Sequence, residues 1–262
     1  MFEDLYGKAA LITGGASGIG RAAAVRLSSF GVKVVIAAAH NVKGGQETVA
    51  EIRAAGGEAV FQQADVSKEE DVKSLVERTV SEFGSLDLAF NNAGIGPDGV
   101  RIPFAPLTDF SVRDFDDIVA TNLRGVFLCL KYELIQMKKQ GRGGAIVNTS
   151  SVGGIRMVPG FGAYGPSKAA INAITQTAAL ESGADGIRVN AICPGPTVGT
   201  ILMDNNISSS PEGDLERMRN MIPLKKVGTV EDVANACVFL LSSASGHTTG
   251  QLFSIDGGMH AM

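Results

Sequence analysis

The sequence predicts an α/β fold in which about seven parallel strands form a doubly wound sheet with helices on both faces. Short apolar runs rich in β-branched residues alternate with longer helical patterns throughout the 262 residues. No Pro- or Ser-rich linker interrupts this alternation, so we expect one domain over residues 1–262. The 33 glycines and the 45% of hydrophobic residues suit a compact protein with many tight turns between strands and helices.

The predicted strands and helix boundaries follow from these patterns. Strands are expected at 9–13, 32–38, 58–65, 86–90, 144–150, 187–193 and 252–256. Capping-box patterns, in which a Ser or Thr precedes an acidic residue by three positions, predict helix starts at Ser67, Ser111 and Thr229. Helices are expected to stop at Gly31, Gly56 and Gly84.

One long segment fits neither the strand nor the helix pattern. Residues 194–222 mix Pro, Ser, Asn and Met between a strand and the last helices. A loop of this length in a compact domain is usually functional and often acts as a lid. We therefore expect a substrate loop near 196–222.

Charge and hydropathy exclude several classes of function. The net charge of −4, with scattered Lys and Arg, offers no basic patch for nucleic acid. No apolar run reaches the roughly 18 residues of a membrane span, and acidic residues stand near the start where a signal peptide would be basic, so we expect a cytoplasmic protein without a membrane partner. The three cysteines and three histidines show no disulfide or metal-ligand spacing, and we expect buried, reduced thiols and no metal.

The glycine-rich turn TGGASGIG, residues 13–20, follows the first predicted strand where a helix begins. Its glycines at 14, 18 and 20 permit a tight turn and close backbone approach, and a helix N-terminus offers free N–H groups to a pyrophosphate. The spacing differs from the standard G-x-G-x-x-G pattern, and the alternative is an ordinary structural turn. Its place after the first strand of an alternating β/α pattern favours a dinucleotide site.

Four other predicted strands also end in small or polar residues. These ends carry Asp65, NNAG (91–94), NTSS (148–151) and CPGP (193–196). Ligands of parallel α/β sheets bind beyond the carboxyl ends of the strands. The four ends are therefore expected to face the same ligand as the glycine turn.

Tyr164 and Lys168, in YGPSK, lie on one face of a predicted helix with a rise of about 6 Å between them. An ammonium beside a phenol stabilises the phenolate and lowers its pKa from about 10. The pair could therefore transfer a proton to or from an alcohol or ketone oxygen, which Ser151 could hold. The alternative is a tyrosine that caps the helix and a lysine that extends to solvent.

Six motifs, in the order TGGASGIG, NNAG, TNLRG, Ser151, YGPSK and CPGP, resemble those of the short-chain dehydrogenase/reductase family over the whole chain. The resemblance, to the short single-domain form, implies a Rossmann-type fold and a catalytic tetrad of Asn122, Ser151, Tyr164 and Lys168. It implies that Tyr164 is the general acid/base and that Ser151 polarises the substrate oxygen. It further implies that Lys168 binds the nicotinamide ribose and lowers the tyrosine pKa, while Asn122 holds a water in a proton relay.

The resemblance also implies cofactor contacts. Asp65 and Val66 would hold the adenine ring, and Thr197 would meet the carboxamide through its backbone, although PGPTVGT places the next threonine, Thr200, one position later than the family pattern. The expected cofactor-binding residues are Thr13, Gly14, Ser17, Gly18, Ile19, Gly20, His40, Asp65, Val66, Asn92, Ala93, Gly94, Tyr164, Lys168, Pro194, Gly195 and Thr197.

The end of the second strand bears on the choice of nicotinamide. NAD-dependent members of the family usually carry an acidic residue there, whereas this sequence has Ala38, Ala39 and His40. The arginine typical of NADP-dependent members is also absent, since Ala39 and Ser17 stand at its usual positions. We expect NAD(P), with a slight preference for NADP, whose phosphate His40 or Lys43 could meet; alternatively both are solvated surface residues.

Together the motifs predict a reversible oxidoreductase that moves a hydride between NAD(P) and a secondary alcohol or ketone. Two alternatives remain, a reductase of 3-oxoacyl thioesters on the same scaffold and a nucleotide-sensing protein without chemistry. A largely apolar substrate pocket is expected between residues 96–104 and a wall formed by Ile201, Leu202, Met203, Met218 and Met221. By resemblance, a homotetramer or homodimer is expected to assemble through two long helices at 111–140 and 163–182.

Overall fold

The computed structural model describes residues 2–209 and 213–261, and its centre is one seven-stranded sheet. The strands run in the order β3-β2-β1-β4-β5-β6-β9, and every neighbouring pair is parallel. They are β1 (Ala9–Thr13), β2 (Lys33–Ala38), β3 (Ala59–Gln63), β4 (Leu88–Asn91), β5 (Gly144–Thr149), β6 (Ile187–Pro194) and β9 (Leu252–Ile255). The predicted α/β fold with seven parallel strands is confirmed, and the strand order reverses beside β1, where such sheets bind ligands.

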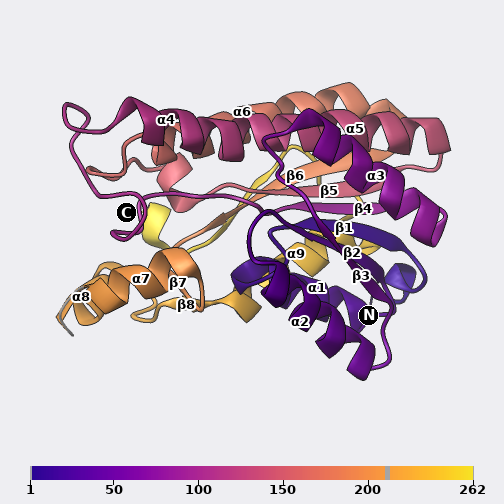
Figure 1. Ribbon diagram of the computed structural model, residues 1–262, viewed down its shortest axis with the longest axis horizontal. Coiled ribbons are helices and arrows are strands. Elements are labelled where there is room, and N and C mark those ends of the chain that lie inside the picture. The colour runs from indigo at the N-terminus through magenta and orange to yellow at the C-terminus, as the bar shows by residue number, and fades with distance from the viewer. Residues whose placement is uncertain (1, 210–212, 262) are drawn as a thin grey trace.

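Helices cover both faces of this sheet, as Figure 1 shows. One face carries α1 (Gly18–Ser28), α2 (Val42–Ala54) and α9 (Val230–Leu241). The other carries α3 (Glu69–Phe83), α5 (Gly125–Gln140) and α6 (Tyr164–Ser182). Each face has its own apolar core, around Ile36 and Val238 on the first and Ile146 and Ile171 on the second. Coverage of both faces explains why the strands are near-continuous apolar runs.

Two strand boundaries differ from the prediction by two residues, and the others by at most one. β3 ends before Asp65, because the backbone N–H of Asp65 donates to the side chain of Asp71 at 2.8 Å. β4 begins only after Leu86, because the side-chain amide of Gln140 bonds both the N–H and the carbonyl of Leu86. In both places a side chain takes the hydrogen-bonding position of a neighbouring strand's backbone. The apolar pattern of the sequence does not reveal such a side-chain partner.

The helix predicted at 111–140 is one continuous element with an internal irregularity. It consists of α4 (Val112–Ile118), a π-helical segment (Val119–Arg124) and α5. Short π-helical turns are frequent at functional sites, and this one contains Asn122. The second long helix, α6, lies where it was predicted.

Two of the three predicted helix starts are confirmed. Thr229 forms a complete capping box with Asp232 at the start of α9, and Ser111 accepts a hydrogen bond from the N–H three residues later. The prediction at Ser67 is wrong, because its hydroxyl donates to Asp65 at 2.7 Å and α3 begins two residues later. The predicted helix-stopping glycines all have positive φ: Gly31, Gly56 and Gly84.

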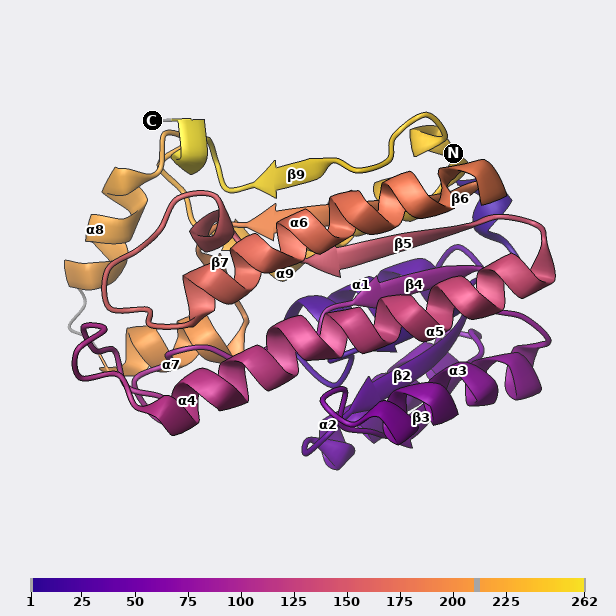
Figure 2. The same cartoon turned by 90° about the horizontal axis from the view of Figure 1, so that it is seen from above.

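The segment after β6 is folded, and the expectation of a long irregular loop there is wrong. It contains β7 (Thr197–Val198), which pairs with β8 (Gly228–Thr229), and two helices, α7 (Ile201–Ser209) and α8 (Gly213–Met221). Residues 210–212 of the predicted loop lie outside the described residues. Figure 2 shows α7 and α8 beyond the carboxyl ends of the strands, at the end of the molecule that α4 also reaches.

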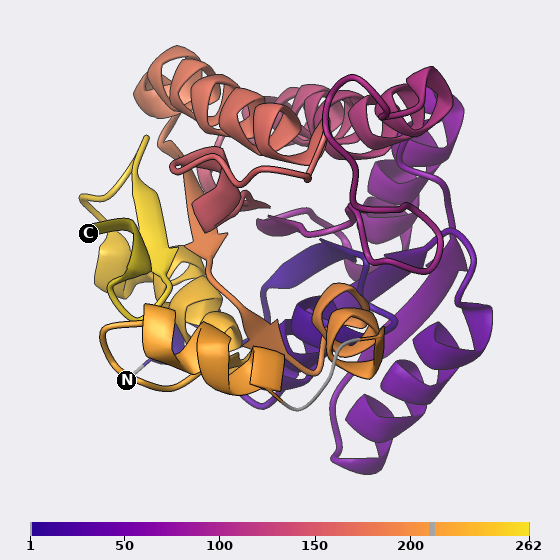
Figure 3. The ribbon, with the colours of Figure 1, turned by 90° about the vertical axis from the view of Figure 1, so that its left-hand side faces the viewer.

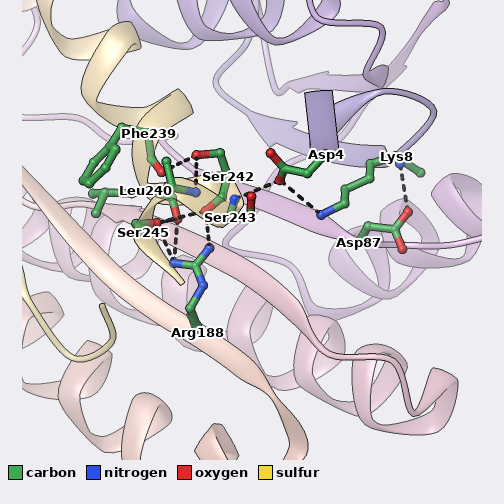
Figure 4. Close-up of polar contacts among 11 residues, drawn as sticks. Asp4, Lys8, Asp87, Arg188, Phe239, Leu240, Ser242, Ser243 and Ser245 are labelled. Atoms are coloured by element: carbon green, nitrogen blue, oxygen red, sulfur yellow. Dashed lines mark hydrogen bonds and ion pairs between the residues drawn. The ribbon is translucent and has the colours of Figure 1, made fainter. Parts of the chain in front are cut away.

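A polar cluster around Arg188 closes the opposite edge of the sheet (Figure 4). The guanidinium donates to the carbonyl oxygens of Leu240 at 2.8 Å and Ser242 at 3.0 Å, at the end of α9. The carboxylate of Asp4 accepts from the N–H of Ser243 at 2.8 Å. These contacts fix α9 and the N-terminal segment against the start of β6.

The described residues also bear on the expectations about membranes, metals and thiols. No described helix is both long and apolar enough to cross a bilayer. The described residues contain no group of three or more His, Cys, Asp or Glu side chains placed to hold a metal ion. Cys129, Cys193 and Cys237 are buried free thiols, as predicted, and burial raises the pKa of each.

Candidate active site

The carboxyl ends of the strands meet along the edge of the sheet that faces the viewer in Figure 3. A cleft of about 1340 Å³ runs along this edge. Most predicted site residues line it: Gly14, Ser17, Gly18, Ile19, His40, Asp65, Val66, Asn92, Ala93, Gly94, Ser151, Tyr164, Lys168, Pro194, Gly195 and Thr197. Three predicted residues that the structure describes are not part of the lining: Thr13, Gly20 and Asn122.

The glycine turn forms the part of the cleft between β1 and α1. Gly14 and Gly18 have φ angles of 67° and 55°, which glycine adopts without strain. A Cβ on Gly20 would lie 2.2 Å from the carbonyl oxygen of Gly14, so α1 packs against the turn at a distance that only glycine allows. The N-cap residue Ser17 makes no side-chain capping bond to any described residue, which leaves the first N–H groups of α1 for an anion in the cleft.

Thr13 supports the cofactor end of the cleft from behind. Its Oγ1 accepts hydrogen bonds from the N–H groups of Asn92 at 3.0 Å and Ala93 at 3.2 Å. The side-chain amide of Asn92 donates back to the carbonyl oxygen of Gly14 at 3.3 Å. The end of β1 and the segment after β4 are therefore clamped together, and Thr13 shapes the wall rather than lining it.

Asp65 and Val66 form a wall at the end of the cleft farther from Tyr164. Oδ1 of Asp65 accepts from the N–H and the hydroxyl of Ser67 at 3.0 and 2.7 Å, which fixes the carboxylate in the turn after β3. A Cβ on Gly125 would lie 2.8 Å from Cγ2 of Val66, so the start of α5 packs closely behind this wall.

The end of β2 lines the same region with Ala38 and His40. The nearby cations are engaged elsewhere or exposed. Arg21 pairs with Glu51 at 2.7 Å, and the side chain of Lys43 is 88% exposed. Of the two side chains expected to meet a phosphate, only His40 is part of the cleft lining.

Tyr164 and Lys168 face the cleft from the first turns of α6. Nζ of Lys168 donates to the carbonyl oxygen of Thr149 at 2.8 Å and lies 5.6 Å from the centroid of the Tyr164 ring. Lys168 is only 3% exposed, which rules out the alternative of a lysine that extends to solvent. The two side chains share one cleft, as their spacing predicts.

The pKa of Tyr164 shifts in the direction opposite to the one expected. Burial raises the pKa of Tyr164, and a hydrogen bond with the hydroxyl of Ser151 offsets this only in part. Burial lowers the pKa of Lys168 to about 8, and its ammonium is directed to Thr149 rather than to the phenol. Oγ of Ser151 also accepts from the N–H of Gly153 at 3.0 Å, which fixes the serine beside the tyrosine.

Asn122 is fully buried in the π-helical segment and holds the segment after β4. Its Oδ1 accepts from the N–H of Ile95 at 2.8 Å, and its Nδ2 donates to the carbonyl oxygen of Ile95 at 2.8 Å. The same Nδ2 donates to Oγ of Ser167 at 3.1 Å. Its side chain thus joins one wall of the cleft to α6 at Ser167, which lies three residues after Tyr164 and one before Lys168.

The two threonines after β6 stabilise the turn that they form. Oγ1 of Thr197 donates to the carbonyl oxygen of Gly195 at 2.9 Å, and Oγ1 of Thr200 donates to the carbonyl oxygen of Thr197 at 2.9 Å. Both threonines line the cleft. The side chain of Thr197 is therefore occupied within the turn, and a contact with a cofactor would use its backbone N–H.

Two glycines whose contacts the sequence did not reveal, Gly96 and Gly154, help to determine the shape of the cleft, together with the predicted Gly94. A Cβ on Gly96 would lie 2.5 Å from the Tyr164 ring, and one on Gly154 would lie 2.7 Å from the backbone of Lys168. A Cβ on Gly94 would lie 3.3 Å from Nζ of Lys168, so a glycine there leaves open the space beside the ammonium that a ribose would need. This space and the free N–H groups of α1 fit a dinucleotide. The signal in the sequence is a glycine five residues after the end of β4 and another five residues after the end of β5.

The other end of the cleft is mostly apolar, as predicted. Ile102, Val158 and Phe161 line it. The five predicted wall residues line it as well: Ile201, Leu202, Met203, Met218 and Met221. Phe104 is not part of the lining and packs edge-on against Phe161 with ring centroids 5.1 Å apart.

A buried carboxylate that the sequence did not reveal joins the two walls of this apolar end. Oδ1 of Asp98 accepts from the N–H groups of Val100, Arg101 and Ile102 at 3.0, 2.7 and 3.2 Å. Its Oδ2 accepts from Nδ2 of Asn205 in α7 at 3.2 Å. The segment after β4 and the helix after β6 are thereby connected across the cleft.

The charged side chains of the lining near this end nearly balance. Arg101 lies 3.8 Å from Asp98, and Arg113 lies 3.9 Å from Asp117. Asp114 adds a further acidic side chain. This group of five, which we call the rim charges, has no excess of positive charge.

A parallel sheet with a glycine turn at its reversal point, facing a buried lysine and a tyrosine, is typical of dinucleotide-dependent oxidoreductases. Residues 14–260 match the family model described as "Enoyl-(Acyl carrier protein) reductase". Together with the relatives below, this match shows that the chain belongs to the short-chain dehydrogenase/reductase family. It is an oxidoreductase of a family that uses NAD(P), as the motifs predict.

The relatives match over nearly their whole length. The chain is 43% identical to an "Uncharacterized oxidoreductase" of Thermotoga maritima, over 99% of this chain and 100% of that protein. It is 39% identical to the 2,5-dichloro-2,5-cyclohexadiene-1,4-diol dehydrogenase of Sphingobium indicum, over 99% and 100%. It is 38% identical to a 3-oxoacyl-(acyl-carrier-protein) reductase of Staphylococcus epidermidis, over 97% and 99%. The crystal structure of levodione reductase superposes with a TM-score of 0.91 at 36% identity, covering 98% of both chains.

Proposed function

We propose that this protein catalyses reversible hydride transfer between NAD(P) and a secondary alcohol or ketone, with Tyr164 as the general acid/base. The observation that carries the proposal is the position of Tyr164 beside buried Lys168, whose ammonium is fixed by the carbonyl of Thr149 at 2.8 Å. When bound, the nicotinamide supplies or accepts the hydride. The side chains of this cleft then have two tasks, to hold the substrate oxygen and to move its proton.

Each member of the tetrad has a distinct part in this proposal. In reduction, the hydroxyl of Tyr164 donates its proton to the ketone oxygen, and in oxidation the phenolate accepts it. Ser151, whose hydroxyl lies beside the phenol, donates a hydrogen bond to the same oxygen. The ammonium of Lys168 stabilises the phenolate and holds the ribose. Because the side chain of Asn122 bonds Ile95 and Ser167, Asn122 would hold the water of the proton relay through its backbone.

The remaining cleft residues would bind the dinucleotide. The N–H groups at the start of α1 suit the pyrophosphate, because a helix N-terminus attracts anions. Asp65 and Val66 suit the adenine end, and Gly94 suits the ribose beside Lys168. We further propose a preference for NADP, because Ala38 stands where a carboxylate would repel a 2′-phosphate, and His40 lines the cleft nearby. Tighter binding of NADH than of NADPH to the purified protein contradicts this preference.

The rim charges favour a small uncharged ketone over a thioester carried by an acidic carrier protein. A carrier with negative charge requires a positive docking surface, whereas the rim combines Arg101 and Arg113 with three aspartates, Asp98, Asp114 and Asp117. The apolar, methionine-containing wall suits ring-shaped or aliphatic substrates. A 3-oxoacyl-thioester reductase, the activity in the name of one relative, is the second candidate.

The test is oxidation of NADPH and NADH against a panel of cyclic ketones, aliphatic ketones and a 3-oxoacyl thioester. Turnover with free ketones at a higher kcat/KM than with the thioester supports the proposal. The reverse ranking supports the second candidate. Cofactor binding without turnover of any substrate in either direction supports a nucleotide-sensing protein instead.

Assembly, domain organisation and location complete the proposal. We treat residues 1–262 as one cytoplasmic domain that forms a homotetramer or homodimer through the two long helices. Apolar side chains exposed on α5 and α6 support this assembly, since Phe127, Ile135 and Leu180 are 47%, 56% and 86% exposed. Light scattering tests the assembly, and a monomeric mass contradicts it.

A further inference from the structure

Glu133, on α5, is a fully buried carboxyl group that the proposed mechanism does not use. Its Oε2 accepts a hydrogen bond from Nδ2 of Asn91 at 2.9 Å. Its Oε1 has no hydrogen-bond partner, and no salt bridge reaches Glu133, among the residues that the structure describes. Such a group needs an explanation, because an isolated buried carboxylate is costly.

The hydrogen bond from Asn91 begins a chain that connects four elements. Nδ2 of Asn91, in β4, also donates to Oδ1 of Asn148 in β5 at 3.0 Å. Nδ2 of Asn148 donates to Oγ1 of Thr175 in α6 at 2.9 Å, and Thr175 donates to the carbonyl oxygen of Ile171 at 2.7 Å. The chain thus joins α5 to α6 through the two central strands, and none of Glu133, Asn91, Asn148 and Thr175 is more than 2% exposed.

This chain lies directly behind the cofactor end of the cleft. Asn91 precedes Asn92, whose side chain bonds the glycine turn. Asn148 precedes Thr149, whose carbonyl oxygen holds the ammonium of Lys168. A shift of either asparagine would therefore move a strand end that faces the cofactor.

The surroundings of Glu133 favour its uncharged form. Burial raises the pKa of Glu133 to about 7, and the neighbouring thiol of Cys129, whose own pKa is raised, brings no positive charge. Oδ1 of Asn91 also lacks a hydrogen-bond donor among the described residues. A proton on Oε1 of Glu133 removes the buried charge and turns one of the two unpaired acceptors of the cluster into a donor.

We propose that Glu133 is a positioning residue, which in its uncharged form holds Asn91 and, through it, Asn148. These two asparagines in turn fix the ends of β4 and β5. The end of β4 leads to Asn92, which bonds the glycine turn, and the end of β5 carries the carbonyl of Thr149, which holds Lys168. The proposal rests on one part of the proposed function, which is that the cofactor binds at the carboxyl ends of the strands. Glu133 acts only through its neighbours and does not touch the reacting atoms.

The experiment compares Glu133→Gln with Glu133→Leu. Glutamine is uncharged, keeps an oxygen for Asn91 and supplies an N–H donor, whereas leucine fills similar space without any polar atom. We measure the dissociation constant of NADPH and NADH from nicotinamide fluorescence, and amide hydrogen exchange at 88–94 and 144–150. We expect the leucine variant to bind cofactor at least tenfold more weakly and to exchange faster in both segments. The glutamine variant is expected to stay within twofold of the unchanged protein in both measurements.

A matched pair of threonines tests the other end of the chain. Thr175 and Thr79 are both 0% exposed, and each hydroxyl donates to the carbonyl one turn earlier, at 2.7 and 2.8 Å. Only Thr175 also accepts from Asn148. Thr175→Val is expected to weaken cofactor binding at least twofold more than Thr79→Val, and to increase exchange at 144–150.

Two results overturn the proposal. One is a glutamine variant that changes affinity and exchange as much as the leucine variant, and the other is a leucine variant that matches the unchanged protein. If Glu133→Leu does not fold, the threonine pair decides, and equal effects of the two valine variants overturn the proposal. If the unchanged protein binds neither NADPH nor NADH, the proposed function fails, while the exchange measurements still decide on Glu133.

Discussion

The two halves of the cleft are built in different ways. In the cofactor half, which comprises the glycine turn 13–20, the ends of β4 and β5 and Lys168, the contacts are short and mostly involve the backbone. In the substrate half, which comprises residues 95–104 with α7 and α8, the lining consists largely of apolar side chains. Ile201 and Met221 there remain 57% and 45% exposed, whereas Lys168 is almost fully buried.

This difference indicates how the cleft divides its tasks. Close packing of backbone atoms at the glycines leaves this part of the chain little room to move, so the cofactor half presents one shape to a dinucleotide. Methionine and other flexible apolar side chains adapt to ligands of different shape, so the substrate half can change its contacts without changing the chemistry. Tyr164 stands at the junction, with Gly96 against its ring and Lys168 one turn away.

The largest expected effect is that of Tyr164→Phe, which tests the junction itself. Loss of the general acid/base should lower kcat by about 10³-fold, because positioned proton transfer contributes roughly 10²- to 10⁴-fold. The dissociation constant of NADPH or NADH should stay within twofold, since the substitution leaves the glycine turn, the end of β4 and Lys168 unchanged. Single-turnover kinetics and fluorescence titration measure the two quantities. A Phe variant with near-normal kcat removes Tyr164 from the mechanism.

A change in stability with pH is the next largest effect and probes the support beneath the cofactor half. Burial raises the pKa of Glu133 from 4.5 to about 7, so the folded protein keeps a proton that the unfolded chain releases between these values. The free energy of unfolding therefore falls as pH rises through this window. Glu133→Gln removes this loss, so its advantage in stability should grow by on the order of 3 kcal/mol between pH 4.5 and pH 8. Urea unfolding at several pH values measures it, and a constant difference between the two proteins contradicts the expected protonation.

Gly20→Ala tests whether the cofactor half tolerates any displacement. The added Cβ would lie 2.2 Å from the carbonyl oxygen of Gly14, so the glycine turn must move. We expect cofactor binding to weaken about thirtyfold, or ~2 kcal/mol, which is within the range for overpacking. Gly183→Ala is the matched control, because nothing lies within 4 Å of its added Cβ. Equal affinities of the two alanine variants would show that the cofactor half is more adaptable than its geometry indicates.

The cofactor half was largely predictable from the sequence because short-range rules determine it. Strands, glycine turns and an i,i+4 pair leave regular patterns, and the carboxyl ends of parallel strands must meet at one edge. The positions of Gly14, Tyr164 and Lys168 in one cleft follow from these rules. The direction of the Tyr164 pKa did not follow, because burial depends on the packing of the whole cleft.

The substrate half and the support behind the sheet were less predictable for another reason. Helices α7 and α8 have no clear apolar period, so a loop was expected where the structure has helices. The bond between Asp98 and Asn205 joins residues 107 positions apart, and the bond between Glu133 and Asn91 joins residues 42 positions apart. Neither pair has a local signal, since tertiary packing alone brings the partners together.

Asn205→Ala has the smallest expected effect and tests whether the two halves act independently. It removes the bond to Asp98 across the substrate end but leaves the three backbone bonds of that carboxylate intact. Loss of one hydrogen bond to a charged group should raise KM for the ketone about twelvefold, or ~1.5 kcal/mol. Cofactor affinity should not change, because the described hydrogen bonds that clamp the glycine turn come from the segment after β4 and not from α7. Thr177→Ala, at an exposed position on α6, serves as the control for truncation of a surface side chain. If cofactor affinity falls as much as KM rises, the cleft behaves as one unit, and the contrast between a fixed cofactor half and an adjustable substrate half is wrong.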